Sequence, residues 1–381
     1  MSNIEKTIAS AFMEVADIFE NKVSMKKGRI ALTMLGSEHP EENALLGALI
    51  AAKHGVDVVV IGTLEHEGVT TMKATTEEEA HTIMDELLKG GDVDAAVTMH
   101  YPFPIGVSTV GRVVTPSIGR EMFIATTTGT SSLDRTEGLV KNAISGIAAA
   151  KACGIAKPTV GILNIDGARQ AEGILKELVA GGYDINFATS GRSDGGCVMR
   201  GNDVLAGTPD VLICDPLTGN VMMKMLSSYT TGGSYESLGY GYGPGIGDGY
   251  DKVIMIISRA SGAPVIANAL IYASELVLGK VKEVAKKEYD AAKKAGLNKI
   301  LDSKKNQPKE AADEVVAPPT EVVTAQISGI EIMDLEDGVK VLWKEGIYAQ
   351  SGMGCTGPII LVSDSNLDKS VELLKKAGYI S

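Results

Sequence analysis

Short aliphatic runs alternate with segments of helical pattern along most of this chain. The runs span 29–34, 57–61, 95–99, 159–164, 211–214 and 253–257. The segments between them predict helices over 43–54, 77–89, 139–153 and 169–178, and a further helix that starts over 222–226. A long helix with a possible break at Gly279 is expected over 267–294. Apolar strands separated by helices are typical of parallel sheets covered on both faces. The alternation therefore predicts an α/β fold.

The length of the chain favours more than one domain. Its 381 residues exceed what one compact core usually holds, and 44% hydrophobic residues are enough to fill two cores. A second α/β block begins after Pro158. We expect an N-terminal helix over 1–22, followed by two α/β domains. Domain I is discontinuous and covers 23–154 and 258–298, and domain II covers 155–257. A linker over 299–325 then leads to a small C-terminal α/β module over 326–381.

Both ends of the chain and one internal segment have their own patterns. Apolar residues at helical spacing within 4–19 predict an amphipathic helix that packs on the core or on a partner subunit. Eight of the 18 residues in 232–249 are glycine, so we expect a mobile flap, a binding loop or a partner contact. In the C-terminal module we expect a hairpin from 330–335 and 339–343, a loop over 351–358, a strand at 359–362 and a helix over 367–377.

The charge balance and the cysteine count exclude several classes of protein. The formal charge is 36 − 48 = −12, which disfavours binding to nucleic acid or to anionic membranes. Four cysteines do not make a disulfide scaffold. No apolar run reaches the roughly 18 residues of a membrane span, and the N-terminus lacks the apolar stretch of a signal peptide. We therefore expect a cytoplasmic protein.

Cys355 is the strongest candidate for a catalytic residue. It lies in the sequence GMGCTGP (352–358), where flanking glycines can expose the thiol and free backbone N–H groups. Such groups stabilise a thiolate and the oxyanion of an acyl intermediate, so Gly354 and Thr356 are the expected oxyanion donors. The alternative is a buried cysteine in a glycine turn. Cys153 and Cys214 are better explained by packing.

A second set of residues suits phosphate. Ser258, Arg259 and Ser261 follow the expected strand at 253–257, and arginine and hydroxyl groups are good donors to phosphate oxygens. Asp215, Asn220 and Lys224 lie where another expected strand meets a helix, so we expect them to face the same cleft. Lys224 could instead be a solvated surface charge.

Other chemistries have weaker support in the sequence. His100 follows an expected strand and is a weak candidate for a general base. No CxxC or HExxH occurs, and no GxxxxGK[ST] loop, so we expect no metal site and no nucleotide. Gly241 and Gly243 begin a GxGxxG-like pattern without a clear preceding strand, which leaves a nicotinamide dehydrogenase poorly supported.

Residues 155–225 resemble a known family. Their GILN (161–164), INF (185–187) and ICDPLTGNVMMK (213–224) are similar, in the same order, to motifs of the phosphate acyltransferase of phospholipid synthesis, which is related to phosphotransacetylase. Ser258-Arg259 resembles the phosphate site of phosphotransacetylase. With the GMGCTGP tail included, the whole chain resembles the alpha subunits of component C of the glycine/sarcosine/betaine reductase complex.

This resemblance implies a fold, a reaction and partners. The fold would be a two-domain α/β/α sandwich of the isocitrate-dehydrogenase-like type with the cleft between the domains. Component C would take a two-carbon unit from a selenoprotein carrier, hold it as an acetyl thioester on Cys355 and transfer the acetyl group to phosphate, with inorganic phosphate as co-substrate and no cofactor. The beta subunit of component C would be a partner in a hetero-oligomer. The alternatives are a lipid-pathway acyltransferase and a non-catalytic scaffold subunit.

Overall fold

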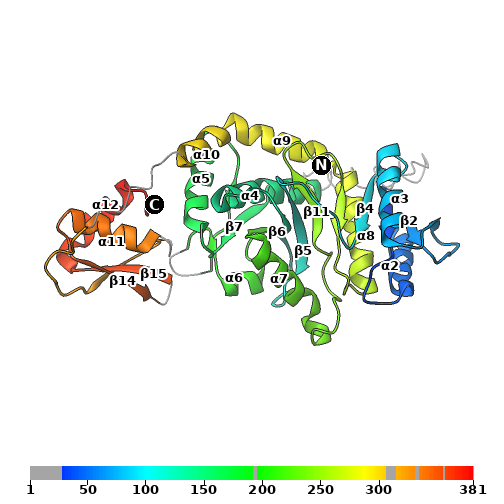
Figure 1. Cartoon of the computed structure of the whole chain (residues 1–381), viewed down its shortest axis with the longest axis horizontal. Helices are drawn as coiled ribbons and strands as arrows, with labels where there is room; N and C mark the ends of the chain where they lie inside the picture. Colours follow the sequence, from blue (N-terminus) through cyan, green and yellow to red (C-terminus); the bar gives the residue numbers. More distant parts are fainter. Residues whose placement is uncertain (1–27, 192–194, 306–314, 331–333, 355–356, 381) are drawn as a thin grey trace, which may run out of the picture.

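The computed structural model describes residues 28–191, 195–305, 315–330, 334–354 and 357–380 (Figure 1). A 12-stranded sheet runs through the larger body, and a separate 3-stranded sheet lies in the C-terminal module. The strands of the large sheet are β1 Arg29–Thr33, β2 Asp57–Gly62, β3 Thr70–Lys73, β4 Ala95–Thr98, β5 Val107–Val114, β6 Glu121–Thr130, β7 Thr159–Leu163, β8 Asn186–Phe187, β9 Val198–Met199, β10 Val211–Ile213, β11 Gly243–Gly247 and β12 Ile254–Ile256.

Within the described residues, ten helices flank this sheet or connect its strands. They are α2 Glu41–Lys53, α3 Glu77–Gly90, α4 Arg135–Ala152, α5 Ala168–Ala180, α6 Gly201–Ala206, α7 Pro216–Ser228, the short η1 Tyr229–Thr231, α8 Ala263–Leu278, α9 Val281–Lys294 and α10 Leu297–Lys305. Helices α8 and α9 are separate helices on either side of Gly279, so the possible break in the helix expected over 267–294 is confirmed.

The order of the strands decides where ligands can bind. The path is β3-β2-β1-β4-β12-β11-β5-β6-β10-β7-β8, with β9 paired to β7. Strands β1, β2, β3, β4 and β12 are parallel, and so are β6, β7, β8, β9 and β10. Three successive antiparallel pairings, β12–β11–β5–β6, lie between the two sets. Because three reversals leave the second set inverted, the carboxyl ends of the two sets lie at opposite edges of the sheet.

Helices cover both faces of the sheet, which makes the body an α/β/α sandwich. On one face α2, α4 and α8 share a large apolar core with the strands, to which they contribute Ala48, Ile147 and Leu270. On the other face α3 packs over β1 and β2, while α6 and α7 pack over β5, β6 and β10. The predicted mixed α/β class is confirmed, whereas its assignment to the isocitrate-dehydrogenase-like type stays a prediction.

Local sequence explains how the helices next to the site begin and end. Thr76 precedes α3 and its hydroxyl accepts the N–H of Glu79, while Gly91 ends the helix with a φ of +75°. Asp215 precedes α7 and its carboxylate accepts the N–H groups of Leu217 and Thr218. These are ordinary helix caps, so both helix starts are set by local residues.

The C-terminal module has its own sheet and its own core. Strands β13 Ala325–Ser328, β14 Ala349–Gly354 and β15 Gly357–Val362 pair antiparallel in the order β13-β15-β14. Helices α11 Leu335–Lys344 and α12 Leu367–Lys376, with the short η3 Asp364–Asn366, cover it. Figure 1 shows the module at one end of the molecule, beyond α5 and α10. The expected helix near the C-terminus is confirmed as α12.

Several expectations for the chain outside the α/β pattern are wrong. The second strand of the hairpin expected from 330–335 and 339–343 is instead part of α11, whose apolar residues recur at helical spacing, and residues 331–333 of the first strand lie outside the described residues. The loop expected over 351–358 is mostly the paired ends of β14 and β15. The start of the expected linker forms α10. The N-terminal helix expected over 1–22 lies outside the described residues.

The glycine-rich segment also differs from expectation. Residues 243–247 form β11, which is buried in the middle of the sheet between β12 and β5. A Cβ at Gly243 would stand 1.7 Å from the carbonyl oxygen of Val110, and its φ is +88°. Glycine here lets two strands approach, so this part is a core strand and not a flap. Of the preceding residues, Glu236 exchanges backbone hydrogen bonds with Ala260 and Gly262 in the turn after β12, and Tyr240 and Gly241 bond to Arg112 of β5.

One further property concerns membranes. Within the described ranges, no single helix is both long and apolar enough to cross a bilayer. In the same ranges, α8 and α9 taken together are long and apolar enough for a span, but the chain bends by 63° between them.

Candidate functional site

The loop after β12 is the centre of the candidate site. The N–H of Ser258 donates to Ser261 Oγ (3.0 Å), and the N–H of Ala260 donates to Ser258 Oγ (3.1 Å). These two bonds make a compact turn that leads into α8 at Ala263. The turn places Ser258 and Arg259 at the carboxyl end of β12, the edge where open α/β sheets bind ligands.

A buried carboxylate supports this turn from the glycine-rich segment. Glu236 is 3% exposed and accepts hydrogen bonds from the hydroxyls of Ser261 (2.8 Å, to Oε2) and Tyr242 (2.8 Å, to Oε1). Lys224 Nζ, on α7, lies 4.0 Å from Glu236 Oε1 and 5.6 Å from the centre of the Tyr242 ring. Burial and the adjacent Glu236 charge raise the pKa of Tyr242 well above its usual value, so its hydroxyl stays a donor. The structure therefore brings Lys224 to the Ser258 turn, as expected from the sequence.

Arg259 is paired with a second carboxylate, from α3. Its Nη2 and Nη1 lie 2.9 Å and 3.3 Å from the two carboxylate oxygens of Glu77, and Nη1 also donates to the carbonyl oxygen of Gly36. About half of each side chain is exposed. Hydrogen bonding to Arg259 lowers the pKa of Glu77, and Glu77 in turn raises the pKa of Arg259. A fork of N–H groups that holds a carboxylate in this way is also suited to phosphate.

Neither acidic residue was identified from the sequence. Glu77 is the first of three consecutive glutamates at the start of α3, and nothing in the pattern distinguishes it from Glu78. Glu236 lies in a segment whose glycines attracted attention instead, 22 residues before Ser258. Both reach the site only because distant segments fold against the end of β12.

A chain of hydroxyls and one imidazole lies at the adjacent strand ends. Thr98, the last residue of β4, is fully buried, and its Oγ lies 2.8 Å from the donating hydroxyl of Thr33, the last residue of β1. His81 Nε2, on α3, lies 3.1 Å from Thr98 Oγ1. His100, the base suggested by the sequence, is exposed, and its carbonyl oxygen accepts from Thr98 at 3.4 Å. Of the two histidines, His81 is the one whose ring is fixed at the strand ends.

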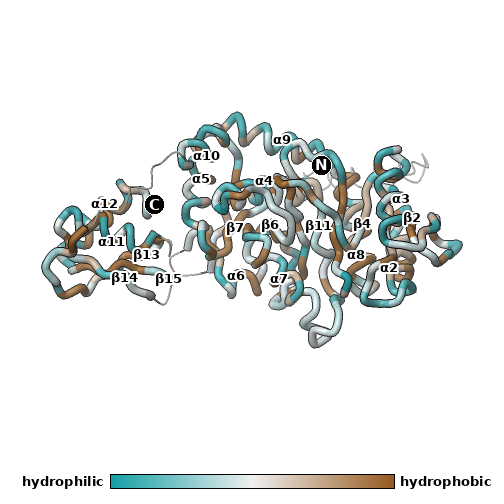
Figure 2. Tube along the Cα trace, in the orientation of Figure 1, coloured by the Kyte–Doolittle hydropathy of each residue, from teal (hydrophilic) through white to brown (hydrophobic). Residues whose placement is uncertain are grey.

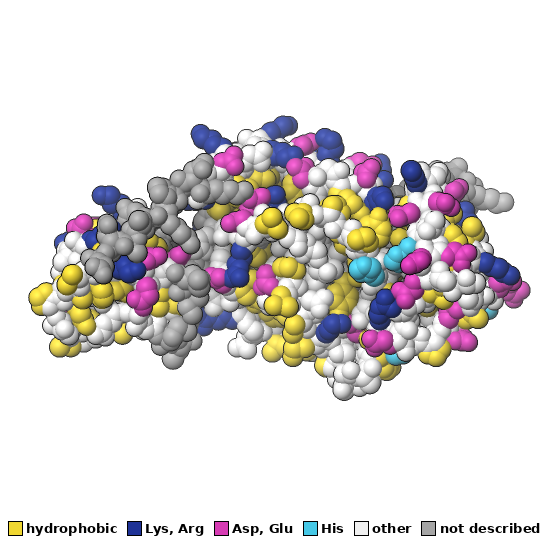
Figure 3. Space-filling view, viewed as in Figure 1, with side chains coloured by type: hydrophobic (Ala, Val, Ile, Leu, Met, Phe, Trp, Pro, Cys, Tyr) yellow, Lys and Arg dark blue, Asp and Glu magenta, His cyan; other side chains and the backbone are white. Residues whose placement is uncertain are grey.

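Asp215 and Asn220 do not join this group, which corrects the expectation that they share its cleft. Asp215 caps α7 through bonds to Leu217 and Thr218, and Asn220 donates to the carbonyl oxygen of Thr127 on β6. Both follow β10, which is inverted relative to β12 and four strand positions away, about 20 Å across the sheet. The reversal of the sheet between the two strands therefore separates both residues from the Ser258 turn. Figure 3 shows hydrophobic side chains over the outer surface of α7, where Leu217, Val221 and Met225 are exposed.

The three cysteines within the described ranges are poor nucleophiles. Burial raises the pKa of Cys153 and of Cys197 to about 12, and raises that of the fully buried Cys214 further. Cys214 donates its S–H to the carbonyl oxygen of Thr126 (3.3 Å). Because the thiolate is the reactive form, none of them is activated at neutral pH. The packing roles expected for Cys153 and Cys214 agree with this environment.

Cys355 and Thr356 lie outside the described residues. The strands before and after them pair up to Gly354, opposite Gly357, so Gly354 is the last residue of β14. In Figure 1 the C-terminal module lies beyond α5, whereas α8, which follows the Ser258 turn, lies toward the other end of the molecule. In the described part, one bond from Gln170 Nε2 to Asp334 Oδ2 (2.9 Å) joins α5 to the module.

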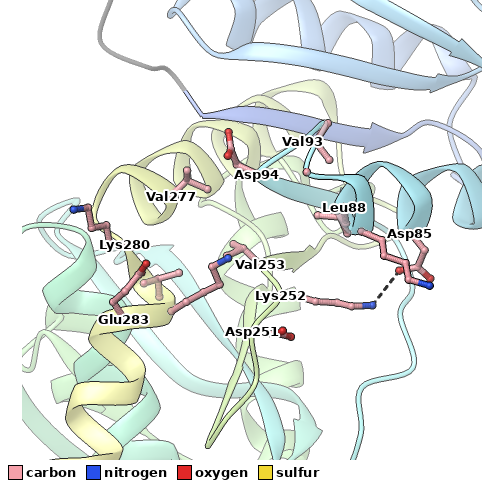
Figure 4. A pocket seen from close by; sticks show the side chains of 14 residues that line it. Asp85, Leu88, Val93, Asp94, Asp251, Lys252, Val253, Val277, Lys280 and Glu283 are labelled. Carbon is pink, nitrogen blue, oxygen red and sulfur yellow. Dashed lines mark hydrogen bonds and ion pairs between the residues drawn. The ribbon is translucent and has the colours of Figure 1, made fainter.

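A cavity of about 770 Å³ lies at the opposite edge of the sheet from Ser258 (Figure 4). Val93 and Asp94, just before β4, and Val253, just before β12, contribute to its wall. Lys252 points toward Asp85, and their Nζ and Oδ1 atoms are 3.3 Å apart (Figure 4). The cavity mixes lysines with acidic residues and contains none of the candidate site residues, so it is separate from the site at the carboxyl end of β12.

Comparison with known proteins assigns the chain to a family. A family model described as fatty acid synthesis protein matches residues 28–361. The glycine/sarcosine/betaine reductase complex component C subunit alpha of Peptoclostridium acidaminophilum is 56% identical over 385 residues, which cover 100% of both chains. A phosphate acyltransferase of Thermus thermophilus is 29% identical over 235 residues, covering 52% of this chain and 70% of that protein.

Among solved structures, a branched-chain phosphotransacylase from Enterococcus faecalis superposes with a TM-score of 0.44 at 16% identity, covering 65% of this chain and 99% of that chain. The sequence matches decide the family assignment, since one of them extends over the full length of the chain. The chain therefore belongs to the fatty acid synthesis protein family, in which it groups with the alpha subunits of component C of the glycine/sarcosine/betaine reductase complex and shares a core with the phosphate acyltransferases.

Proposed function

We propose that this chain carries an acetyl group as a thioester on Cys355 and transfers it to inorganic phosphate, which yields acetyl phosphate. Similarity to phosphate acyltransferases supports acyl transfer to phosphate, and full-length similarity to a component C alpha subunit supports a role in the reductase complex. The observation that carries the proposal is the turn after β12, where Arg259 and two serine hydroxyls lie beside Lys224 at a strand end.

The chemistry of the transfer is simple. An oxygen of phosphate attacks the thioester carbonyl carbon, a tetrahedral intermediate forms, and the carbon–sulfur bond breaks to release the Cys355 sulfur. A thioester is activated enough for this step, so no ATP is consumed. Arg259, Lys224 and Ser258 would hold the phosphate oxygens and bring the attacking atom close to the acyl group. The backbone N–H groups of Gly354 and Thr356 are our candidates for the oxyanion donors.

We infer that the C-terminal module moves, or acts on another chain, when it delivers the acyl group. Twenty residue steps separate Lys305, at the end of α10, from Ala325, at the start of β13. Fully extended, such a stretch reaches about 65 Å. A tether of this length supports delivery of the acyl group from the module to the Ser258 turn of the same chain. The beta subunit of component C and a selenoprotein carrier are the partners we propose for the loading step.

Acyl-enzyme formation tests the function directly. The purified full chain is incubated with acetyl phosphate, which runs the transfer in reverse, and the intact mass and a peptide map are recorded. We expect one acetyl group on the native chain and none on Cys355→Ala. Cys153→Ala is the matched control and should be acetylated like the native chain. Full acetylation of Cys355→Ala would show that the thioester is elsewhere.

A lipid-pathway acyltransferase is the second candidate, because the family model is described as fatty acid synthesis protein and phosphate acyltransferases match half of the chain. The two functions differ in acyl length. Rates measured with acetyl and palmitoyl donors separate them: preference for acetyl supports the reductase role, and preference for palmitoyl supports the lipid pathway.

A further inference from the structure

His81 lies beside the proposed phosphate site, and the function argued so far gives it no part. It stands one helical turn after Glu77 on α3, so the two side chains project from the same face of the helix. Glu77 contacts Arg259, which is the main cause of its lowered pKa, and a positive charge on His81 is near enough to lower it further. This places the imidazole next to the Glu77–Arg259 pair.

The strand ends place His81 at the same location independently. Thr98, whose hydroxyl lies 3.1 Å from His81 Nε2, is the register partner of Ile256 on the neighbouring strand β12. Ser258 follows Ile256 by two residues. His81 is therefore adjacent to the Ser258–Arg259 turn both along α3 and across the sheet.

The ring of His81 is fixed at one nitrogen only. Nε2 is held by Thr98, which in turn accepts from the buried Thr33. Within the part of the chain that the structure describes, Nδ1 has no hydrogen-bond partner in the protein. An imidazole anchored through one nitrogen, with the other unoccupied, can accept a proton and release it without changing its position.

The proposed reaction requires such a proton carrier. At neutral pH the phosphate that attacks carries a proton on one oxygen, whereas the phosphoryl group of the acyl phosphate product carries none. The sulfur that leaves needs a proton to become a thiol. The proton lost by phosphate is therefore the one that sulfur gains, and no other reactant is needed for the balance.

We propose that His81 is a catalytic residue that carries this proton, accepting it from phosphate as the oxygen attacks and donating it to sulfur as the carbon–sulfur bond breaks. This inference rests on the proposed function. Arg259 and Lys224 bind the anion but stay charged, so they cannot take the proton. Glu77 is engaged by Arg259. His39 also reaches the turn, where its Nε2 lies 3.3 Å from the carbonyl oxygen of Ala260, but of these two imidazoles only His81 is anchored through the buried hydroxyl of Thr98 at the strand ends.

The test uses arsenate-dependent breakdown of acetyl phosphate by the full chain, with arsenate in place of phosphate. His81→Ala removes the ring, and His81→Gln keeps a donor to Thr98 but cannot carry a proton. We expect both to lower kcat about 100-fold, with a KM for arsenate close to that of the native chain. Imidazole added to the buffer should restore activity to His81→Ala. His100→Ala, a histidine in the same neighbourhood, is the matched control and should retain native kcat.

The outcomes separate this inference from the proposed function. A native chain with no arsenate-dependent activity would overturn the proposed function and this inference with it. An active native chain whose kcat is unchanged in His81→Gln would overturn the role of His81 alone. So would a loss in His81→Ala that imidazole fails to restore, since that result indicates a structural role.

Discussion

Each cation of the candidate site is accompanied by a carboxylate. Arg259 has Glu77, and Lys224 has Glu236, which is buried and also holds Ser261 and Tyr242. The two carboxylates differ in what they do. Glu77 is half exposed, so an anion can displace it from Arg259. Glu236 is buried, so water cannot replace its partners, and it supports the turn structurally. The following predictions separate anion binding from this structural support.

Arg259→Lys should raise the KM for phosphate about tenfold and change kcat little. Lysine keeps the charge but loses the planar fork, and a loss of about 1.4 kcal/mol in binding corresponds to a factor of ten. Steady-state kinetics with varied phosphate measures it. Arg29→Lys is the control, because Arg29 is a half-buried partner of Asp57 at the opposite edge of the sheet and the substitution should leave the KM unchanged. An unchanged KM in Arg259→Lys would remove Arg259 from the phosphate site.

Glu236→Gln should lower kcat and destabilise the fold. The glutamine side chain has one acceptor oxygen, whereas the carboxylate of Glu236 has two. Either Ser261 or Tyr242 therefore loses its hydrogen-bond acceptor. A buried hydroxyl without an acceptor costs about 1–3 kcal/mol. Urea unfolding and steady-state kinetics measure the two effects. Glu65→Gln, a fully exposed glutamate paired with Lys73, should behave like the native chain in both assays.

Asp203 gives a prediction for pH. Burial by itself would raise its pKa, but hydrogen bonds from the N–H groups of Arg200 and Gly191 and from the hydroxyls of Ser190 and Thr208 outweigh burial and lower it. A carboxyl whose pKa is lower in the folded chain than in the unfolded chain stabilises the fold at any pH above its unfolded pKa of about 3.9. This stabilisation is lost as the pH falls through the pKa of the folded state. Asp203→Asn should therefore be less stable than the native chain at pH 7, with the difference shrinking in acid. Urea midpoints at pH 7 and pH 3 test this, and a gap that widens in acid would contradict it.

At the scale of elements, close backbone approach holds α7 against β6. A Cβ on Gly219 would lie 1.8 Å from the carbonyl oxygen of Thr126, so the helix cannot sit where it does with a larger residue. The expected start of a helix over 222–226 identified part of α7, but not this contact.

Apolar content alone also failed to distinguish α11 from a hairpin, because ten residues with alternating and helical spacing of apolar side chains fit both patterns.

Gly219→Ala should push α7 away from the sheet and destabilise the chain by about 1–3 kcal/mol, as overpacking does. It should also lower phosphate affinity, because Lys224 lies on the same helix. Gly173→Ala is the matched control: it lies within α5 and its Cβ would meet nothing within 4 Å, so alanine should stabilise by about 0.5–1 kcal/mol. Urea unfolding of both variants measures the contrast. Equal stabilities would mean that α7 can shift without cost.

At the scale of the whole molecule, two bodies with separate cores are connected by the stretch from Lys305 to Ala325. The C-terminal module has its own apolar cluster, including Ile327, Leu342 and Ile360, and no member of it belongs to the cores of the large sheet. Such a module can keep its fold while its position changes, which is what transfer from a carrier to a distant turn demands.

Deletion of residues 306–314 should stop acetyl transfer to phosphate while leaving both bodies folded. It cuts the extended reach from about 65 Å to about 35 Å. Acetylation of Cys355 by a loaded partner and release of acetyl phosphate are measured separately. Replacement of the same nine residues by glycine and serine keeps the length and should restore release. Native release rates in the deletion variant would show that a long tether is not required.

What the sequence by itself determined is local or repetitive: the α/β class, most strand and helix positions, and the place of Ser258 and Arg259 directly after a strand, because periodicity depends on neighbours in the chain. What only the tertiary structure decided depends on pairings between distant segments. The three antiparallel pairings through β11 and β5 separate Asp215 from Ser258, and the approach of α3 and of the glycine-rich segment brings Glu77, His81 and Glu236 to the end of β12. No local pattern records such contacts, since they arise from strand order and from the direction in which each strand runs.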